Sequence, residues 1–288
     1  MRRAAGLLVA AVLAIGAAPA HAAAGGYVAL GDSFAAGGGL LPISTAAVGP
    51  TCFQSTRNYP KLVQRALKLP AFTDETCSGA QTRDMTARQI LSWDDKTVEN
   101  GPQFDALRAD TALVTVGIGG NDIGFTTIVG DCLSALPTGT KCRNRYVRNG
   151  VDLVRARIVE LRPKLTAVLA GIRARSPRAL IVTVSAPRFL PPDPRRCWPV
   201  VPVASGDAPW LEGIQHELSR AIRETGDAFG AVHADVEAAS LGHDACQRQV
   251  SRRWVEALPA RAFNVFHPSY QGERGMADVV LRAVAAAP

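Results

Sequence analysis

The hydrophobic pattern of this chain alternates between two kinds of segment. Short, continuously apolar runs, typical of strands buried on both faces of a sheet, occur at Tyr27–Leu30, Ala112–Val116, Leu180–Val184 and Ala231–Val236. Stretches with apolar side chains on one helical face occur at Lys61–Leu69, Val151–Ser176, Leu211–Thr225 and Met276–Ala287. The alternation predicts an α/β fold with a mainly parallel sheet, and we expect Pro163 to kink or split the longest helix.

Two stretches break this pattern. Residues 37–49 are rich in glycine, and residues 187–209 hold seven prolines, which makes both helix and strand implausible there. Their apolar side chains include Leu40, Leu41, Ile43, Trp198 and Trp210. These loops either cover the core or wall an apolar substrate groove, and the pattern alone leaves both interpretations open.

The N-terminal residues are typical of a secretory signal. Arg2 and Arg3 precede an uncharged apolar run, and Ala20-His21-Ala22 has the small-x-small form of a cleavage site. The run is shorter than the roughly 20 residues that a membrane-spanning helix needs. We therefore predict a signal peptide over residues 1–22, export from the cell, and one domain over residues 23–288.

Composition narrows the class of protein. The 288 residues are 47% hydrophobic and 20% charged, which is ordinary for a globular protein. The formal charge of +7 is spread along the chain, without a basic helix face interleaved with aromatic residues. We expect no nucleic-acid partner, at most peripheral contact with a membrane or lipid surface, and a monomer.

Six cysteines in an exported chain indicate three disulfides. Fifteen connectivities are possible, and pairing of sequence neighbours is the simplest: Cys52–Cys77, Cys132–Cys142 and Cys197–Cys246. The cysteine and histidine spacing does not fit a metal site, so we predict no bound metal.

Three motifs after predicted strands carry candidate chemistry. Ser33, in Gly31-Asp32-Ser33, lies where open parallel sheets bind ligands, and a following helix would hold negative charge near its hydroxyl. Asn121, in Gly119-Gly120-Asn121-Asp122, is able to donate to an oxyanion. His267, followed by a proline and a predicted helix, is the one histidine with a motif around it. A solvated or capping serine and a tight turn are the competing interpretations of the first two motifs taken singly.

Taken in order, the motifs GDSF, C-S-G-A, GGND and N-x-x-H-P resemble those of the GDSL lipase/esterase family, the SGNH hydrolases. The resemblance implies a three-layer α/β/α sandwich and a cofactor-free serine esterase. It further implies that Ser33 is the nucleophile and His267 the general base. The oxyanion hole would combine the backbone N–H groups of Ser33 and Gly79 with the side chain of Asn121.

The chain departs from the family pattern at one important position. Asn264 stands where the family has an Asp three residues before the histidine, and an amide cannot stabilise an imidazolium as a carboxylate does. We therefore predict a Ser33–His267 dyad in which a carbonyl of Asn264, backbone or side chain, orients the imidazole. Glu273 and Asp278 are weaker candidates for that role.

The favoured function is hydrolysis of lipid-like or other acyl esters through an acyl-Ser33 intermediate. A phospholipase and an O-deacetylase of polysaccharides or small molecules remain open, because the reacting atoms are the same. A secreted binding module without catalysis is the alternative from another class, and Asn264 is the feature that favours it.

Overall fold

The computed structural model describes residues 26–46, 48–69, 71–93, 96–258 and 264–288. The predicted signal peptide, residues 1–22, lies outside the described residues. None of the helices in these ranges has the length and the apolar character that a membrane span requires.

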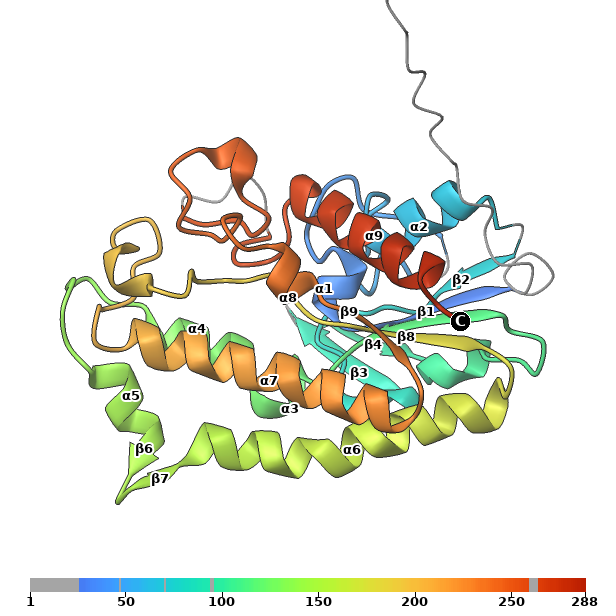
Figure 1. Cartoon of the computed structure of the whole chain (residues 1–288), viewed down its shortest axis with the longest axis horizontal. Coiled ribbons are helices and arrows are strands. Elements are labelled where there is room, and N and C mark those ends of the chain that lie inside the picture. The colour runs from blue at the N-terminus through green and yellow to red at the C-terminus, as the bar shows by residue number, and fades with distance from the viewer. Residues whose placement is uncertain (1–25, 47, 70, 94–95, 259–263) are drawn as a thin grey trace, which may run out of the picture.

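A five-stranded parallel sheet forms the centre of the molecule (Figure 1). Its order is β2-β1-β5-β8-β9, with β1 Tyr27–Gly31, β2 Phe72–Asp74, β5 Leu113–Gly117, β8 Leu180–Val184 and β9 Val232–Ala234. The four predicted strands are therefore confirmed, with boundary shifts of up to two residues. The three-residue strand β2 was not predicted, because it is too short to show a periodicity.

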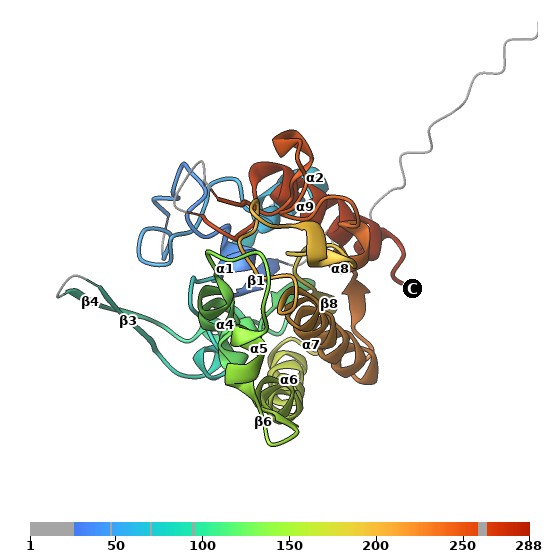
Figure 2. The ribbon, with the colours of Figure 1, turned by 90° about the vertical axis from the view of Figure 1, so that its left-hand side faces the viewer.

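Side chains alternate between the two faces of the sheet, so each face has its own core. Tyr27 and Ala29 face the core formed with α2 Tyr59–Leu67 and α9 Tyr270–Ala285. Val28 and Leu30 face the core formed with α6 Leu153–Arg175 and α7 Ala208–Ala228. Figure 2 shows the two helix pairs on opposite sides of the sheet, which confirms the α/β/α sandwich.

The long helix α6 does not split at Pro163, contrary to one of the two expected outcomes. Proline removes the hydrogen bond to the carbonyl four residues earlier, that of Val159. Val159 is 65% exposed, so this turn of the helix lies on the side that faces solvent, where an unpaired carbonyl costs little. The helix α7 begins at Ala208, inside the stretch expected to be irregular, because Pro209 fits the first turn of a helix.

The remaining elements are short and lie mostly in the loops around the sheet. Two exposed hairpins, β3–β4 and β6–β7, were not predicted, because neither buries a continuous apolar face. The short elements are α1 Ser33–Ala36, β3 Gln89–Trp93, β4 Lys96–Asn100, α3 Gly120–Ile123, α4 Phe125–Cys132, α5 Lys141–Tyr146, β6 Val147–Arg148, β7 Val151–Asp152 and α8 Val236–Ala239, with single 3-10 turns at Thr82–Met85, Gln103–Ala106, Pro194–Arg196 and Val250–Arg252.

The three disulfides join the predicted partners, Cys52–Cys77, Cys132–Cys142 and Cys197–Cys246. The first disulfide joins the loop after β1 to the loop after β2, and the second joins the end of α4 to α5. The third joins the loop after β8 to the loop after α8. Each bridge therefore braces loops beyond the carboxyl ends of the strands, and in the chain-entropy model it adds about 2–4 kcal/mol to the free energy of unfolding.

Candidate active site

The structure places Ser33 at the first position of α1, directly beyond the carboxyl end of β1. The side chain of Asp32 caps the helix by accepting a hydrogen bond from the Phe34 N–H at 3.0 Å. Gly31 makes the sharp entry possible, because its φ is +149° and a Cβ there would lie 2.6 Å from the Gly117 carbonyl oxygen. Ser33 is thus held at the sheet edge with little freedom to move.

His267 lies beside Ser33, although 234 residues separate them in the sequence. Its Nε2 is 2.8 Å from Ser33 Oγ, which is hydrogen-bond distance for a nucleophile and its base. Its Nδ1 is 2.9 Å from the carbonyl oxygen of Val265, which accepts the Nδ1 proton. That bond fixes the tautomer in which Nε2 carries the lone pair facing Ser33.

The expected role of Asn264 as the acceptor for the imidazole is wrong in this structure. Its side-chain amide instead donates to the Pro268 carbonyl at 3.1 Å, and its backbone carbonyl accepts the His267 N–H at 2.9 Å. Asn264 therefore shapes the tight turn that carries the histidine, with Phe266 at a φ of +60°. The acceptor is one residue further along, and a backbone carbonyl leaves no sequence signal.

The two weaker acid candidates are also not partners of the imidazole. Glu273 is fully buried and accepts the Tyr59 N–H at 2.6 Å, at the start of α2. Asp278 is exposed on α9. The described side chains thus give a dyad with a backbone acceptor, and no carboxylate among them bonds His267.

Three candidate donors lie on the segments that form the sheet edge around Ser33. The N–H groups of Ser33 and Gly79 have no acceptor among the described residues, and Gly79 has a φ of +79°, which glycine adopts without strain. Asn121 lies at the start of α3 and donates one amide proton to the Ala80 carbonyl at 2.9 Å. Its second amide proton is available to a ligand.

The two loops that carry these donors are tied to each other. Asp122 accepts hydrogen bonds from both the backbone N–H and the hydroxyl of Thr82. The Gln81 side chain donates to the Asn121 carbonyl at 3.2 Å. These bonds fix the separation of Gly79 and Asn121, as a preorganised oxyanion site requires.

Sequence reasoning missed one further buried residue at this edge, Gln103. Its side-chain amide donates to the Gly31 carbonyl at 2.9 Å and accepts the Gly31 N–H at 2.8 Å. The Gly31 carbonyl also accepts the Cys77 N–H from the segment after β2 at 3.0 Å, whereas Gln103 is the acceptor for the Gly31 N–H. No motif marks this glutamine, which acts by reaching across the fold.

Burial shifts the pKa values of two titratable groups of the site so that the neutral form of each is favoured. It lowers the pKa of the His267 imidazole below its ordinary value of 6.5, and the hydrogen bond to Val265 only partly offsets this. Burial raises the pKa of the Asp32 carboxyl to about 7, with a smaller contribution from the negative charge of Asp122. A neutral imidazole near neutral pH is the form that accepts a proton from serine.

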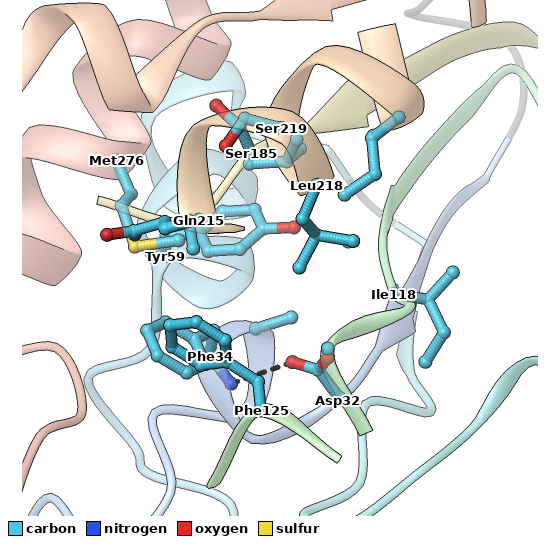
Figure 3. A pocket seen from close by; sticks show the side chains of 16 residues that line it. Asp32, Phe34, Tyr59, Ile118, Phe125, Ser185, Gln215, Leu218, Ser219 and Met276 are labelled. Atoms are coloured by element: carbon cyan, nitrogen blue, oxygen red, sulfur yellow. Dashed lines mark hydrogen bonds between the residues drawn. The ribbon is translucent and has the colours of Figure 1, made fainter. Parts of the chain in front are cut away.

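An apolar pocket of about 50 Å³ lies close to the dyad and is lined by sequence neighbours of Ser33, although neither Ser33 nor His267 lines it (Figure 3). Asp32 and Phe34 flank Ser33 and line the pocket, and Gly120 lines it beside Asn121. The Phe34 ring also lies 5.2 Å from the His267 ring, centre to centre. The other lining residues are Ala35, Tyr59, Gly117, Ile118, Phe125, Val184, Ser185, Ala186, Gln215, Leu218, Ser219, Ile222 and Met276.

The described residues of the two irregular loops, 37–49 and 187–209, do not line this pocket, so it is not the apolar groove that they were expected to wall. Leu40, Leu41, Ile43 and Trp198 do not line it. Trp210 is buried and donates to the Asp152 carboxylate at 2.7 Å, so its role is structural. The pocket is instead built from strand ends, α7 and the residues around Ser33.

The other described histidines lie away from Ser33 and have their own partners. His216 bonds Glu237, His233 bonds Thr183, and His243 bonds the Arg252 carbonyl and stacks on a tryptophan. Within the described residues, no group of three or more His, Cys, Asp or Glu side chains is arranged to hold a metal ion.

Comparison with known proteins gives one consistent result. The model of the GDSL-like Lipase/Acylhydrolase family matches residues 29–274. Lipase 2 of Streptomyces coelicolor is 37% identical over 260 residues, which cover 88% of this chain and 83% of that protein. An esterase of Streptomyces scabiei is 28% identical over 261 residues, covering 80% and 74%.

Solved structures agree with these sequence matches. The phospholipase A1 of Streptomyces albidoflavus superposes with a TM-score of 0.74 at 26% identity, covering 91% of this chain and 100% of that one. The extracellular lipase of Streptomyces rimosus gives a TM-score of 0.73 at 26% identity, covering 90% and 100%.

Proposed function

Because the chain belongs to the GDSL-like Lipase/Acylhydrolase family and is a carboxylic ester hydrolase, we propose that it works through a covalent acyl intermediate on Ser33. The observation that carries this proposal is the 2.8 Å separation of Ser33 Oγ and His267 Nε2. A serine and a neutral imidazole at this distance form an activated nucleophile.

The reaction proceeds in two halves. His267 Nε2 takes the Ser33 proton while Oγ attacks the ester carbonyl carbon, and the carbonyl electron pair moves to oxygen. The tetrahedral intermediate then expels the alcohol, which receives its proton from the imidazolium. Water repeats the same steps on the acyl-enzyme and releases the acid. The Val265 carbonyl keeps Nδ1 protonated throughout and accepts a stronger hydrogen bond when the ring becomes positive.

We assign the oxyanion to the N–H groups of Ser33 and Gly79 and the amide of Asn121. The oxyanion forms next to the N-terminus of α1, whose N–H groups favour negative charge. Removing one such donor in other hydrolases lowers kcat by roughly 10²–10³-fold. The hydrogen bonds of Asp122 and Gln81 hold the donors in place before substrate binds.

We assign the acyl group of the substrate to the pocket beside Phe34. The pocket volume of about 50 Å³ is roughly a third of the 150 Å³ of a cavity that holds benzene. The pocket thus accommodates roughly the first two or three carbons of an acyl chain, and a longer chain extends along the open side. Lipid-like esters remain the favoured substrates, since one structural neighbour is a phospholipase A1 and several relatives are lipases.

We propose that the protein is exported and acts as a monomer. Three disulfides in a chain of this size are typical of oxidising compartments outside the cytosol. The residues 1–22 have the composition of a cleaved signal, and one structural neighbour is an extracellular lipase.

The test is kcat/KM for p-nitrophenyl esters from acetate to palmitate, measured for the wild type and for Ser33→Ala. We expect hydrolysis by the wild type and a loss of about 10⁴-fold or more in the variant, with an unchanged melting temperature. Turnover by Ser33→Ala near the wild-type rate would remove Ser33 from the mechanism. Activity confined to acetate would instead favour an O-deacetylase acting at the same site.

A further inference from the structure

Three exposed apolar side chains stand together on the loops that follow α4 and β8. Leu133, Leu136 and Trp198, here called the apolar rim, are 40%, 67% and 37% exposed. Trp198 donates its indole N–H to the Ser134 carbonyl at 3.3 Å, and the Ser134 hydroxyl bonds the backbone of Leu136. These bonds place the indole beside the loop that carries both leucines.

The backbone under the apolar rim is braced. Leu133 forms an antiparallel bridge with Val203, and the Ser134 N–H donates to the Pro202 carbonyl at 2.7 Å. The disulfides Cys132–Cys142 and Cys197–Cys246 fix the two loops on either side. The backbone is therefore held in place while the apolar side chains are exposed to water, and a group of such side chains is typical of an interaction surface.

The charges around the apolar rim are one-sided. Of the acids near these two loops, Asp131 and Asp193 form ion pairs with Arg145 and Arg195 respectively. Asp207 is buried and accepts the backbone N–H groups of Cys142 and Arg143. Three further basic residues are exposed and have no ion pair among the described residues: Lys141, Arg143 and Arg196. The surface thus presents apolar side chains among unpaired cations.

The apolar rim lies at the same edge of the sheet as the candidate active site. Its two loops extend beyond the carboxyl ends of β5 and β8, and Ser33 follows the carboxyl end of β1 between β2 and β5. Figure 1 shows both loops at the end of the molecule toward which these strands point. A surface that contacts the rim therefore also faces the edge that carries Ser33.

We propose that the apolar rim and its cations dock the enzyme on an anionic phospholipid surface. Leucine side chains enter the acyl boundary, the indole of Trp198 sits at headgroup level, and the cations pair with lipid phosphates. A lipid surface fits better than a protein partner because it alone offers phosphates and acyl chains together, the complement of unpaired cations around apolar side chains. Binding to the surface does not depend on the proposed function. The advantage of binding does rest on it, because docking would present the active site to lipid esters.

The test measures binding of the full chain to vesicles of phosphatidylcholine alone and of phosphatidylcholine with phosphatidylglycerol, by co-sedimentation. We expect binding to the anionic vesicles that weakens with salt. Leu136→Ser should weaken this binding about tenfold, and Arg196→Gln about fivefold. The matched controls are Val159→Ser on α6 and Arg178→Gln before β8, both exposed and far from the rim, which should leave binding unchanged.

A second readout separates this proposal from the proposed function. Hydrolysis of soluble p-nitrophenyl acetate should be the same in Leu136→Ser, Arg196→Gln and wild type, because neither residue contacts the dyad or the pocket. Unchanged soluble turnover with weakened vesicle binding supports the docking surface. Vesicle binding that is absent in the wild type, or equal in the rim variants and their controls, overturns it whatever the esterase result.

Discussion

Replacing Asn264 by aspartate tests whether a backbone carbonyl truly serves in place of an acid. The substitution restores the carboxylate that the family has three residues before the histidine. If the side chain at this position orients the imidazole, Asn264→Asp should raise kcat/KM. The structure predicts no rise in kcat/KM, because Val265 already accepts the Nδ1 proton and the side chain of Asn264 donates to the Pro268 carbonyl instead.

The size of the effect follows from that contact. Asn264 is 1% exposed, and its amide donates to the Pro268 carbonyl at 3.1 Å. Losing the donor leaves a buried carbonyl unpaired, which costs about 1–3 kcal/mol of unfolding free energy. An ionised carboxylate there also faces a carbonyl oxygen in a site closed to water, so its pKa should rise, at about 1.4 kcal/mol for each unit.

The pH dependence of this cost separates the two contributions. When the pKa of a carboxyl is raised in the folded state, the protein loses stability as pH rises from the pKa of the unfolded state, about 4, through the pKa of the folded state. At pH 5 a carboxyl that stays protonated in the folded state is able to donate to Pro268, so the Asn264→Asp variant should lose only about 1.4 kcal/mol, the cost of holding a proton one unit above the unfolded pKa. At pH 8 it should be less stable by about 3 kcal/mol or more.

The assay is urea unfolding at pH 5 and pH 8 together with kcat/KM on p-nitrophenyl butyrate. Asn264→Ala is the matched control, since it loses the same donor without adding charge and its cost should not change with pH. A tenfold rise of kcat/KM in Asn264→Asp with no loss of stability would refute the reasoning, because the carboxylate would then have displaced Val265 as the imidazole partner.

Three further predictions concern the same edge of the sheet. Burial lowers the pKa of His267, and only the neutral ring acts as a base, so kcat/KM should fall with decreasing pH through an apparent value below 6.5; an acidic limb above 6.5 in a pH–rate profile would contradict this. Burial raises the pKa of Asp32 from 3.8 to about 7, so the ionisation of this carboxyl lowers the free energy of unfolding of the protein as pH rises between these values. Asp32→Asn keeps the cap oxygen and should gain about 3–5 kcal/mol of stability relative to the wild type between pH 4 and pH 8 in urea unfolding. If the free energy of unfolding changed equally with pH in both proteins, the raised pKa of Asp32 would be excluded as the cause. Gln103→Leu should cost about 1–3 kcal/mol and lower kcat more than it raises KM, because the Gly31 N–H loses its acceptor while the Gly31 carbonyl keeps the Cys77 N–H; unchanged stability and kcat would show that water replaces the amide.

The parts of the fold that depend on burial were predictable from sequence. The strands β1, β5 and β8 are buried on both faces, so their apolar runs predict them to within one residue. The elements that were missed, β2 and the hairpin β3–β4, are held by tertiary contacts rather than by their own pattern. For example, Gln89 at the base of the hairpin is buried and bonds the Ser78 carbonyl.

The candidate site divides in the same way. The side chains proposed to carry the chemistry, Ser33 and His267, stand in motifs, and the structure brings them to hydrogen-bond distance as the motifs predict. Groups that position them were not predicted, because their contribution is a backbone carbonyl at Val265 or a long-range amide at Gln103. A carbonyl is present at every residue, so only the path of the chain decides which one faces the imidazole.

The turn that carries His267 gives the imidazole an acceptor without an acid. With Phe266 at positive φ, the chain folds back so that the Val265 carbonyl meets Nδ1, while Asn264 closes the turn through Pro268. The amide performs this closure better than a carboxylate, because it donates a hydrogen bond where a carboxylate would place negative charge against an oxygen. The same geometry that removes the acid from the dyad makes the amide the stabilising choice.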